Sequence, residues 1–85
     1  MKAFGYEIGD AYDLGLDEDG AEPICLREVS LSCSPDQLRI LAKFLLHTAD
    51  LLEKHGQDFG HEHLRHWWKD WKREFVDVIV VREQG

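Results

Sequence analysis

A capped amphipathic helix, predicted from Ser34 to His55, constrains the fold more than any other feature of the sequence. Ser34 can accept hydrogen bonds from the free amides of the first turn, and Gln37 completes a capping box with it. Pro35 has the φ angle that suits the first helical position, and Gly56 is a typical residue just beyond a helix end. A helix of this length needs other elements to cover its apolar side, so the sequence predicts a packed domain.

The apolar positions of this helix form a wide stripe. The stripe consists of Leu38, Leu41, Ala42, Leu45, Ala49 and Leu52. We expect Leu45 to be buried within it. Ile40, Phe44 and Leu51 widen the stripe, which predicts contacts on two sides of the helix, one of them with a tryptophan-containing helix further along the chain.

Three segments are predicted to be β-strands. Lys2 to Ile8 and Ile24 to Cys33 alternate between apolar and polar side chains, and Phe75 to Val81 is rich in β-branched residues. Leu64 and the tryptophans that follow it recur at helical spacing, which predicts a second, short helix around Glu62 to Lys72. The expected class is α+β: one domain over residues 1–85, in the order β-β-α-α-β, with a three-stranded sheet and both helices on one face.

The net charge of −7, from 17 acidic and 10 basic residues, disfavours direct binding to nucleic acid and favours a basic protein partner. No run of about 18 apolar residues could span a membrane, and the N-terminal residues lack the pattern of a secretion signal, so we expect a cytoplasmic protein without a membrane partner. Asp17, Glu18 and Asp19 form either a solvated turn or a surface for a cationic partner. They do not match a calcium-binding loop, because Leu26 occupies the position of its closing glutamate.

Three histidines within six positions are the densest chemical signal. His63 and His66 are three residues apart and could share a metal ion on one helix face, with His61 nearby. The zincin motif is absent because position 65 is arginine, and the spacing indicates no further ligand. Solvated or helix-capping histidines are the simpler interpretation. Neither nucleophile motifs nor phosphate-binding loops are present, so the sequence predicts no enzyme and no cofactor.

Three tryptophans in five positions, Trp67, Trp68 and Trp71, are more than one helix face can bury. We expect at least one of them to be partly exposed, and core packing is the simpler interpretation for two of them. An exposed tryptophan flanked by Lys69 and Lys72 would be a suitable anchor for a protein interface, or it could be covered in a homodimer.

Several of these segments together resemble the immunity proteins of bacterial polymorphic toxin systems, and most closely the family of immunity protein 32. The resemblance covers about Glu28 to Val80, and its most specific part is His61 to Leu64, a His-x-His-Leu step. The other segments are Glu28 to Leu31, Ser34 to Leu38, Leu41 to Leu45, Phe59 to Gly60 and Asp77 to Val80. The resemblance implies a non-enzymatic protein that neutralises a cognate toxin domain, often a nuclease, and it implies that His61 and His63 matter.

Three functional hypotheses follow. The first is a toxin-neutralising binding protein that contacts its partner through the tryptophans, His61, His63 and the acidic turn at Asp17, Glu18 and Asp19. The alternatives are a metal-binding protein that uses His61, His63 and His66, and a self-associating structural domain.

Overall fold

A computed structural model describes residues 1–6 and 23–83. The chain divides into two compact units, Met1–Leu31 and Ser32–Gly85, which are described separately below. The described residues form one long helix, one short helix and four short strands, which confirms the α+β class. The assignment of residues 1–85 to a single domain stays a prediction.

The first unit contains two short antiparallel strands, β1 (Ala3–Gly5) and β2 (Ile24–Leu26). Phe4 lies opposite Cys25 in this pairing. The predicted strand from Ile24 to Cys33 is too long, because β2 ends at Leu26, where its pairing with β1 ends. Residues 27–33 are exposed, so the alternation of apolar and polar residues beyond Leu26 does not mark a buried strand face.

Helix α2 (Pro35–His55) in the second unit confirms the predicted helix and its caps. The Gln37 amide donates to Ser34 Oγ at 3.2 Å, and the Ser34 amide donates to Gln37 Oε1 at 2.8 Å, so both halves of the capping box are present. Gly56 follows with a φ of +54°, a conformation that L side chains rarely adopt, and its amide donates to Leu52 O. Local chemistry therefore sets both ends of α2.

Of the two sides of α2 that were predicted to be covered, the structure buries the one that carries Phe44, and the contact of Phe44 with Trp67 confirms that part of the prediction. Phe44 and Thr48 are the buried residues of the helix, with 0% and 1% exposure. Thr48 satisfies its hydroxyl by donating to Leu45 O at 2.9 Å. The prediction that Leu45 is buried is wrong, because 45% of the residue is exposed. Periodicity correctly identified an apolar helix, but it did not identify which apolar side faces the core, since both sides carry leucines.

The chain after α2 contains an additional strand. A 3₁₀ turn, η1 (Gly56–Asp58), leads to strand β3 (His61–His63), helix α3 (Leu64–Trp67) and strand β4 (Ile79–Val81). Strands β3 and β4 pair antiparallel, with Glu62 opposite Val80. The described residues therefore form two two-stranded sheets, β1–β2 and β3–β4, and the predicted three-stranded sheet is wrong.

The predicted helix from Glu62 to Lys72 is also wrong in its bounds, because α3 is only one turn long. His61–His63 forms a strand because each of its three residues pairs with a residue of β4. The same ladder continues into α3, where the Leu64 amide donates to Val78 O at 2.8 Å. After Trp67 the chain turns, with hydrogen bonds from the Trp71 amide to Trp68 O and from the Phe75 amide to Lys72 O. Bulky aromatic residues favour helix only weakly, so the pairing with β4 decides where α3 begins and these local turns follow its end.

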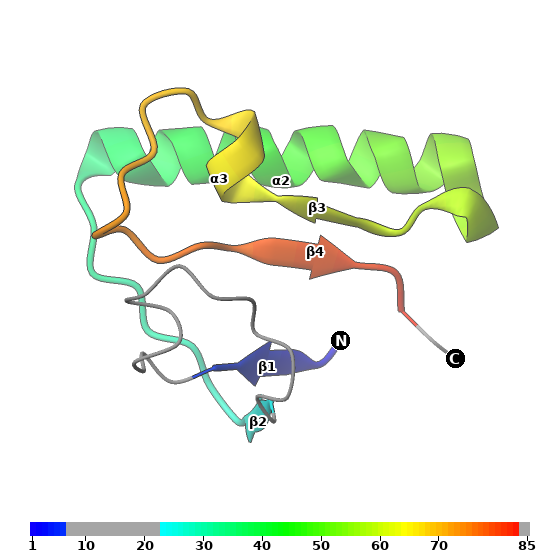
Figure 1. The fold of residues 1–85 in the computed structure, drawn as a ribbon, viewed down its shortest axis with the longest axis horizontal. Coiled ribbons are helices and arrows are strands. Elements are labelled where there is room, and N and C mark those ends of the chain that lie inside the picture. Colours follow the sequence, from blue (N-terminus) through cyan, green and yellow to red (C-terminus); the bar gives the residue numbers. More distant parts are fainter. Residues whose placement is uncertain (7–22, 84–85) are drawn as a thin grey trace. The chain divides into compact units, whose positions relative to one another are not determined.

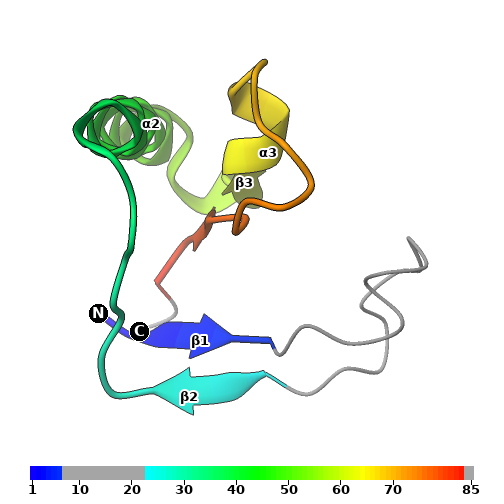
Figure 2. The ribbon, with the colours of Figure 1, turned by 90° about the vertical axis from the view of Figure 1, so that its left-hand side faces the viewer.

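The core of this unit lies between α2, α3 and the segment before β3. Figure 1 shows α3 beside α2 with β3 leading into it, and Figure 2, viewed nearly along α2, shows α3 and β3 on one side of that helix. Phe44, Phe59 and Leu64 are its buried apolar residues. The rings of Phe44 and Trp67 join α2 to α3, with centroids 5.5 Å apart. Among the described residues, no helix combines the length and apolarity that crossing a membrane requires.

Two alanine variants test the side of α2 that faces the core. Phe44→Ala should lower the free energy of unfolding by about 3 to 5 kcal/mol, because it leaves a cavity beside Trp67. Leu45→Ala, on the neighbouring residue, should cost about 1 kcal/mol, because nearly half of that residue is already in water. Urea denaturation at low protein concentration measures both values. Equal losses in the two variants would contradict this orientation of the helix.

Candidate functional site

One face of the β3–β4 sheet carries two of the three clustered histidines. Residues directly opposite each other in an antiparallel ladder share a face. His61 is opposite Val81 and His63 is opposite Ile79, so these four side chains lie on the same face. His61, Ile79 and Val81 are exposed and His63 is partly buried. This face, here called the histidine face (His61, His63, Ile79 and Val81), therefore combines imidazoles with accessible apolar surface.

Asp77, just before β4, contacts the His63 ring on this face and the backbone at the start of α3. Its Oδ2 lies 2.8 Å from His63 Nδ1, and its Oδ1 accepts from the Arg65 amide at 3.1 Å. The Arg65 Nε is 3.5 Å from Oδ2 and adds a positive charge. The first amides of a helix lack partners within the helix, and α3 has no side-chain cap from its own N-cap residue. In α3 the Arg65 amide donates to Asp77 and the Leu64 amide donates to Val78 O. Residues later in the chain therefore satisfy these two amides.

The contact with Asp77 determines which nitrogen of His63 carries hydrogen. An ionised carboxylate can only accept, so His63 Nδ1 must donate to it. In the neutral imidazole, Nε2 then carries the lone pair and can accept a hydrogen bond. The side chains of His63 and Asp77 are 15% and 12% exposed, so this orientation is held in a largely desolvated setting. The result is one imidazole with a defined tautomer and a fixed ring plane.

The three histidines predicted as a cluster do lie together. The ring of His63 is 5.0 Å from that of His61 and 4.9 Å from that of His66, measured between centroids. His61 and His63 lie in β3, whereas His66 lies in α3, so the cluster spans two elements and not one helix face. Within residues 1–6 and 23–83, no three His, Cys, Asp or Glu side chains are arranged to hold a metal ion. The metal-binding alternative therefore gains no support from the geometry.

Each of the three tryptophans is half-buried and has its own contact within the unit. The Trp67 ring packs on Phe44 and stacks on His47, with the latter centroids 5.9 Å apart. Trp68 stacks on Phe75 at 5.4 Å with an interplanar angle of 8°. Trp71 donates from Nε1 to Val76 O at 3.2 Å.

These contacts fix the conformation of the segment from residue 67 to residue 76, here called the aromatic segment. The expectation that at least one tryptophan is partly exposed is confirmed, because all three side chains have an intermediate exposure and none is fully buried. Val76, at 69% exposure, is the apolar residue of this segment most open to solvent.

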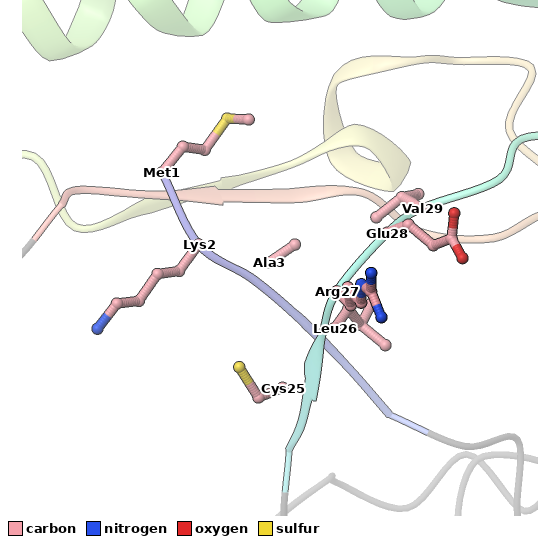
Figure 3. A pocket seen from close by; sticks show the side chains of 8 residues that line it. All are labelled: Met1, Lys2, Ala3, Cys25, Leu26, Arg27, Glu28 and Val29. Carbon is pink, nitrogen blue, oxygen red and sulfur yellow. The ribbon is translucent and has the colours of Figure 1, made fainter.

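Two further candidate regions lie elsewhere in the chain. Asp17, Glu18 and Asp19 fall outside the described residues. The first unit has an open hollow of about 320 Å³, formed by Met1–Ala3 and Cys25–Val29 (Figure 3). Lys2 points away from Arg27 and Glu28 in that view, so the charged groups of the hollow do not converge on one point. The hollow offers no arrangement suited to catalysis.

Asp77 is the residue of this site that the sequence analysis missed. A signal was present, because Asp77 is a charged residue inside the β-branched run from Phe75 to Val81. A carboxylate in such a run needs a hydrogen-bonding or charged partner to be stable when buried. The sequence does not identify the partners, because His63 and Arg65 are 14 and 12 residues away.

Comparison with known proteins gives one match. The model of a protein family described as immunity protein 32 matches residues 28–83, a range that includes α2, the histidine face, the aromatic segment and Asp77. No curated protein and no solved structure matches the chain. Because the family model spans well over half of the chain, this protein belongs to the immunity protein 32 family.

Proposed function

We propose that the protein binds a cognate toxin domain in the cytoplasm of the producing cell and neutralises it without catalysing a reaction. Membership of the immunity protein 32 family is the observation that carries this proposal. An immunity protein needs a rigid, accessible surface more than it needs reactive groups. The described residues offer such a surface at the β3–β4 face and the adjoining aromatic segment.

The histidine face is the proposed centre of the contact with the toxin. His61 can accept or donate hydrogen bonds, the His63 Nε2 can accept one, and Ile79 and Val81 supply apolar surface beside them. Asp77 is proposed as a positioning residue, because it fixes the ring of His63 before the partner arrives. A side chain that is already ordered loses little conformational entropy on binding.

The aromatic segment is proposed as the second part of the contact. Trp67, Trp68 and Trp71 are ordered by contacts within the unit and remain partly accessible. Lys69, between Trp68 and Trp71, and Lys72, directly after Trp71, are exposed. Half-buried tryptophans with charged neighbours are frequent among the residues that dominate binding energy at protein interfaces.

The acidic residues are proposed to speed the encounter with a basic partner. Residues 1–31 contain eight acidic and two basic side chains, a net charge of −6, whereas residues 32–85 contain nine acidic and eight basic ones, a net charge of −1. Nearly all the net negative charge therefore lies in the first unit's sequence, which includes Asp17, Glu18 and Asp19. Such a concentrated field accelerates encounter with a basic surface and affects the association rate more than the dissociation rate.

The proposed function predicts a toxin domain encoded next to this protein. Co-expression of that domain with this chain should relieve the growth arrest that the toxin causes alone, and the two should elute together in size-exclusion chromatography. A neighbouring toxin that keeps its full toxicity beside well-folded immunity protein would contradict the proposal. A gene without any toxin-bearing neighbour would count strongly against it.

Substitutions in the histidine face should weaken the complex. His61→Ala and His63→Ala are each expected to raise the Kd about 10- to 100-fold, as expected for residues at the centre of an interface. Asp77→Asn keeps the size of the side chain and removes the charge beside His63, so it should also raise the Kd. Isothermal titration calorimetry with the toxin domain measures all three values.

Two control variants accompany these substitutions. His55→Ala removes an exposed imidazole at the end of α2, and Asp50→Asn removes an exposed carboxylate of the same helix, outside the proposed contact. Both should bind like the unaltered protein. Thermal melting of every variant separates a loss of binding from a loss of folding. Unchanged Kd values for folded His61→Ala and His63→Ala would remove the histidine face from the interface.

Neutralising the acidic turn should slow association. Asp17→Asn, Glu18→Gln and Asp19→Asn combined should lower the association rate several-fold at low ionic strength, with little change in the dissociation rate. The difference should fade in high salt, because the Debye length shortens. Stopped-flow fluorescence records both rates. A control variant removes three negative charges from the second unit instead, by Asp36→Asn, Asp50→Asn and Asp58→Asn. It should lower the association rate less than the acidic-turn variant does. A larger reduction by the control would refute the proposed role of the acidic turn.

A further inference from the structure

The side of α2 next to its buried face carries an apolar stripe that is left open within the second unit. This outer stripe consists of Leu38, Ala42, Leu45, Ala49 and Leu52. Leu38 and Leu45 are 48% and 45% exposed, both alanines are exposed, and only Leu52 is partly covered. Figure 2 shows α3 and β3 on one side of α2, and no other described element of this unit covers the rest of the helix.

The spacing of the outer stripe is that of a two-helix interface. Its residues follow one another at intervals of four, three, four and three, which is the heptad spacing of paired helices. Leucine and alanine alternate along the outer stripe, so each large side chain is followed by a small one. A surface with this alternation is complementary to a copy of itself that runs in the opposite direction.

We propose that a second copy of this chain covers the outer stripe, and that the two α2 helices pair antiparallel around a two-fold axis. In this register Leu45 meets Ala49 of the second copy, and Ala42 meets Leu52. The same contacts recur on the other side of the axis, as an isologous interface requires. Leu46, which is 69% exposed at the edge of the stripe, lies beside the axis and meets its own counterpart.

The charges along α2 favour the antiparallel direction. Asp36, Arg39 and Lys43 give the N-terminal half a net charge of +1, and Asp50, Glu53 and Lys54 give the C-terminal half a net charge of −1. Antiparallel pairing places opposite charges together, whereas parallel pairing places like charges together. The helix dipoles also oppose each other only in the antiparallel pair.

One reciprocal ion pair makes the register testable. Arg39 and Glu53 lie at equivalent positions on the same edge of the stripe, and antiparallel pairing brings Arg39 of one copy near Glu53 of the other. They are too far apart along one helix to meet within a chain, since 14 residues span about 21 Å. Arg39 now bonds Asp36 at 2.9 Å, but both side chains are largely exposed, so this contact can be exchanged at little cost.

Charge reversal gives an experiment that only an antiparallel dimer can pass. Arg39→Glu and Glu53→Arg should each weaken dimerisation about tenfold, because every substitution acts twice across the axis. A mixture of the two variants should form a heterodimer about as tight as the unaltered dimer, since both ion pairs are then restored, one in its original form and one with its charges exchanged. Sedimentation velocity over a range of concentrations, with one variant carrying a fluorescent label, measures the three affinities.

Two further variants complete the test. Leu45→Asp should abolish the dimer, and Arg82→Glu, which reverses an exposed charge outside α2, should leave the dimer intact. A monomer at all concentrations, or a mixture no tighter than the separate variants, would overturn the proposal. Two other results with a monomeric protein would also overturn it. If Leu45→Asp unfolds the chain, the stripe is covered by residues 1–31. If Leu45→Asp abolishes only toxin binding, the stripe belongs to the toxin interface.

Discussion

A single carboxylate, that of Asp77, joins the parts of the second unit that would otherwise have little to hold them together. It accepts from the His63 ring and from the Arg65 amide, so it links the end of β3 to the start of α3 and to the chain that enters β4. A three-residue strand and a one-turn helix are too short to be stable in isolation. Hydrogen bonds to a charged acceptor are stronger than neutral ones, and partial burial limits competition from water. The histidine face keeps its shape because this carboxylate is in place.

The sequence predicted well what is determined locally. The start and end of α2 depend on Ser34, Gln37 and Gly56, and each acts within a few residues of itself, so the helix could be placed without knowledge of the rest. The predicted strand at Phe75 to Val81 was right in kind and too long, because only Ile79–Val81 finds a paired strand. Membership of the immunity protein 32 family was also indicated by the sequence, chiefly through the step from His61 to Leu64.

The errors concern features that depend on distant residues. His61–His63 carries polar side chains that fit a helix as well as a strand, and its conformation is decided by β4, which comes much later in the chain. Leu45 and Phe44 are adjacent and both apolar, so only the position of Trp67 determines which of them is buried. The role of Asp77 was missed for the same reason. Local patterns indicate that a carboxylate is unusual at a position, but they do not identify its partners.

The short helix α3 shows how such dependence affects motion. In a long helix, most amide hydrogens are protected by carbonyls of the same helix, so their exchange with solvent reports on the opening of that helix. In α3, the first two amides are held instead by Val78 O and by the Asp77 carboxylate. They become accessible when the segment before β4 separates from α3, even if the single turn keeps its shape. The protection of the Leu64 and Arg65 amides from exchange therefore depends on the segment just before β4. We expect this segment and α3 to open and close as one cooperative element.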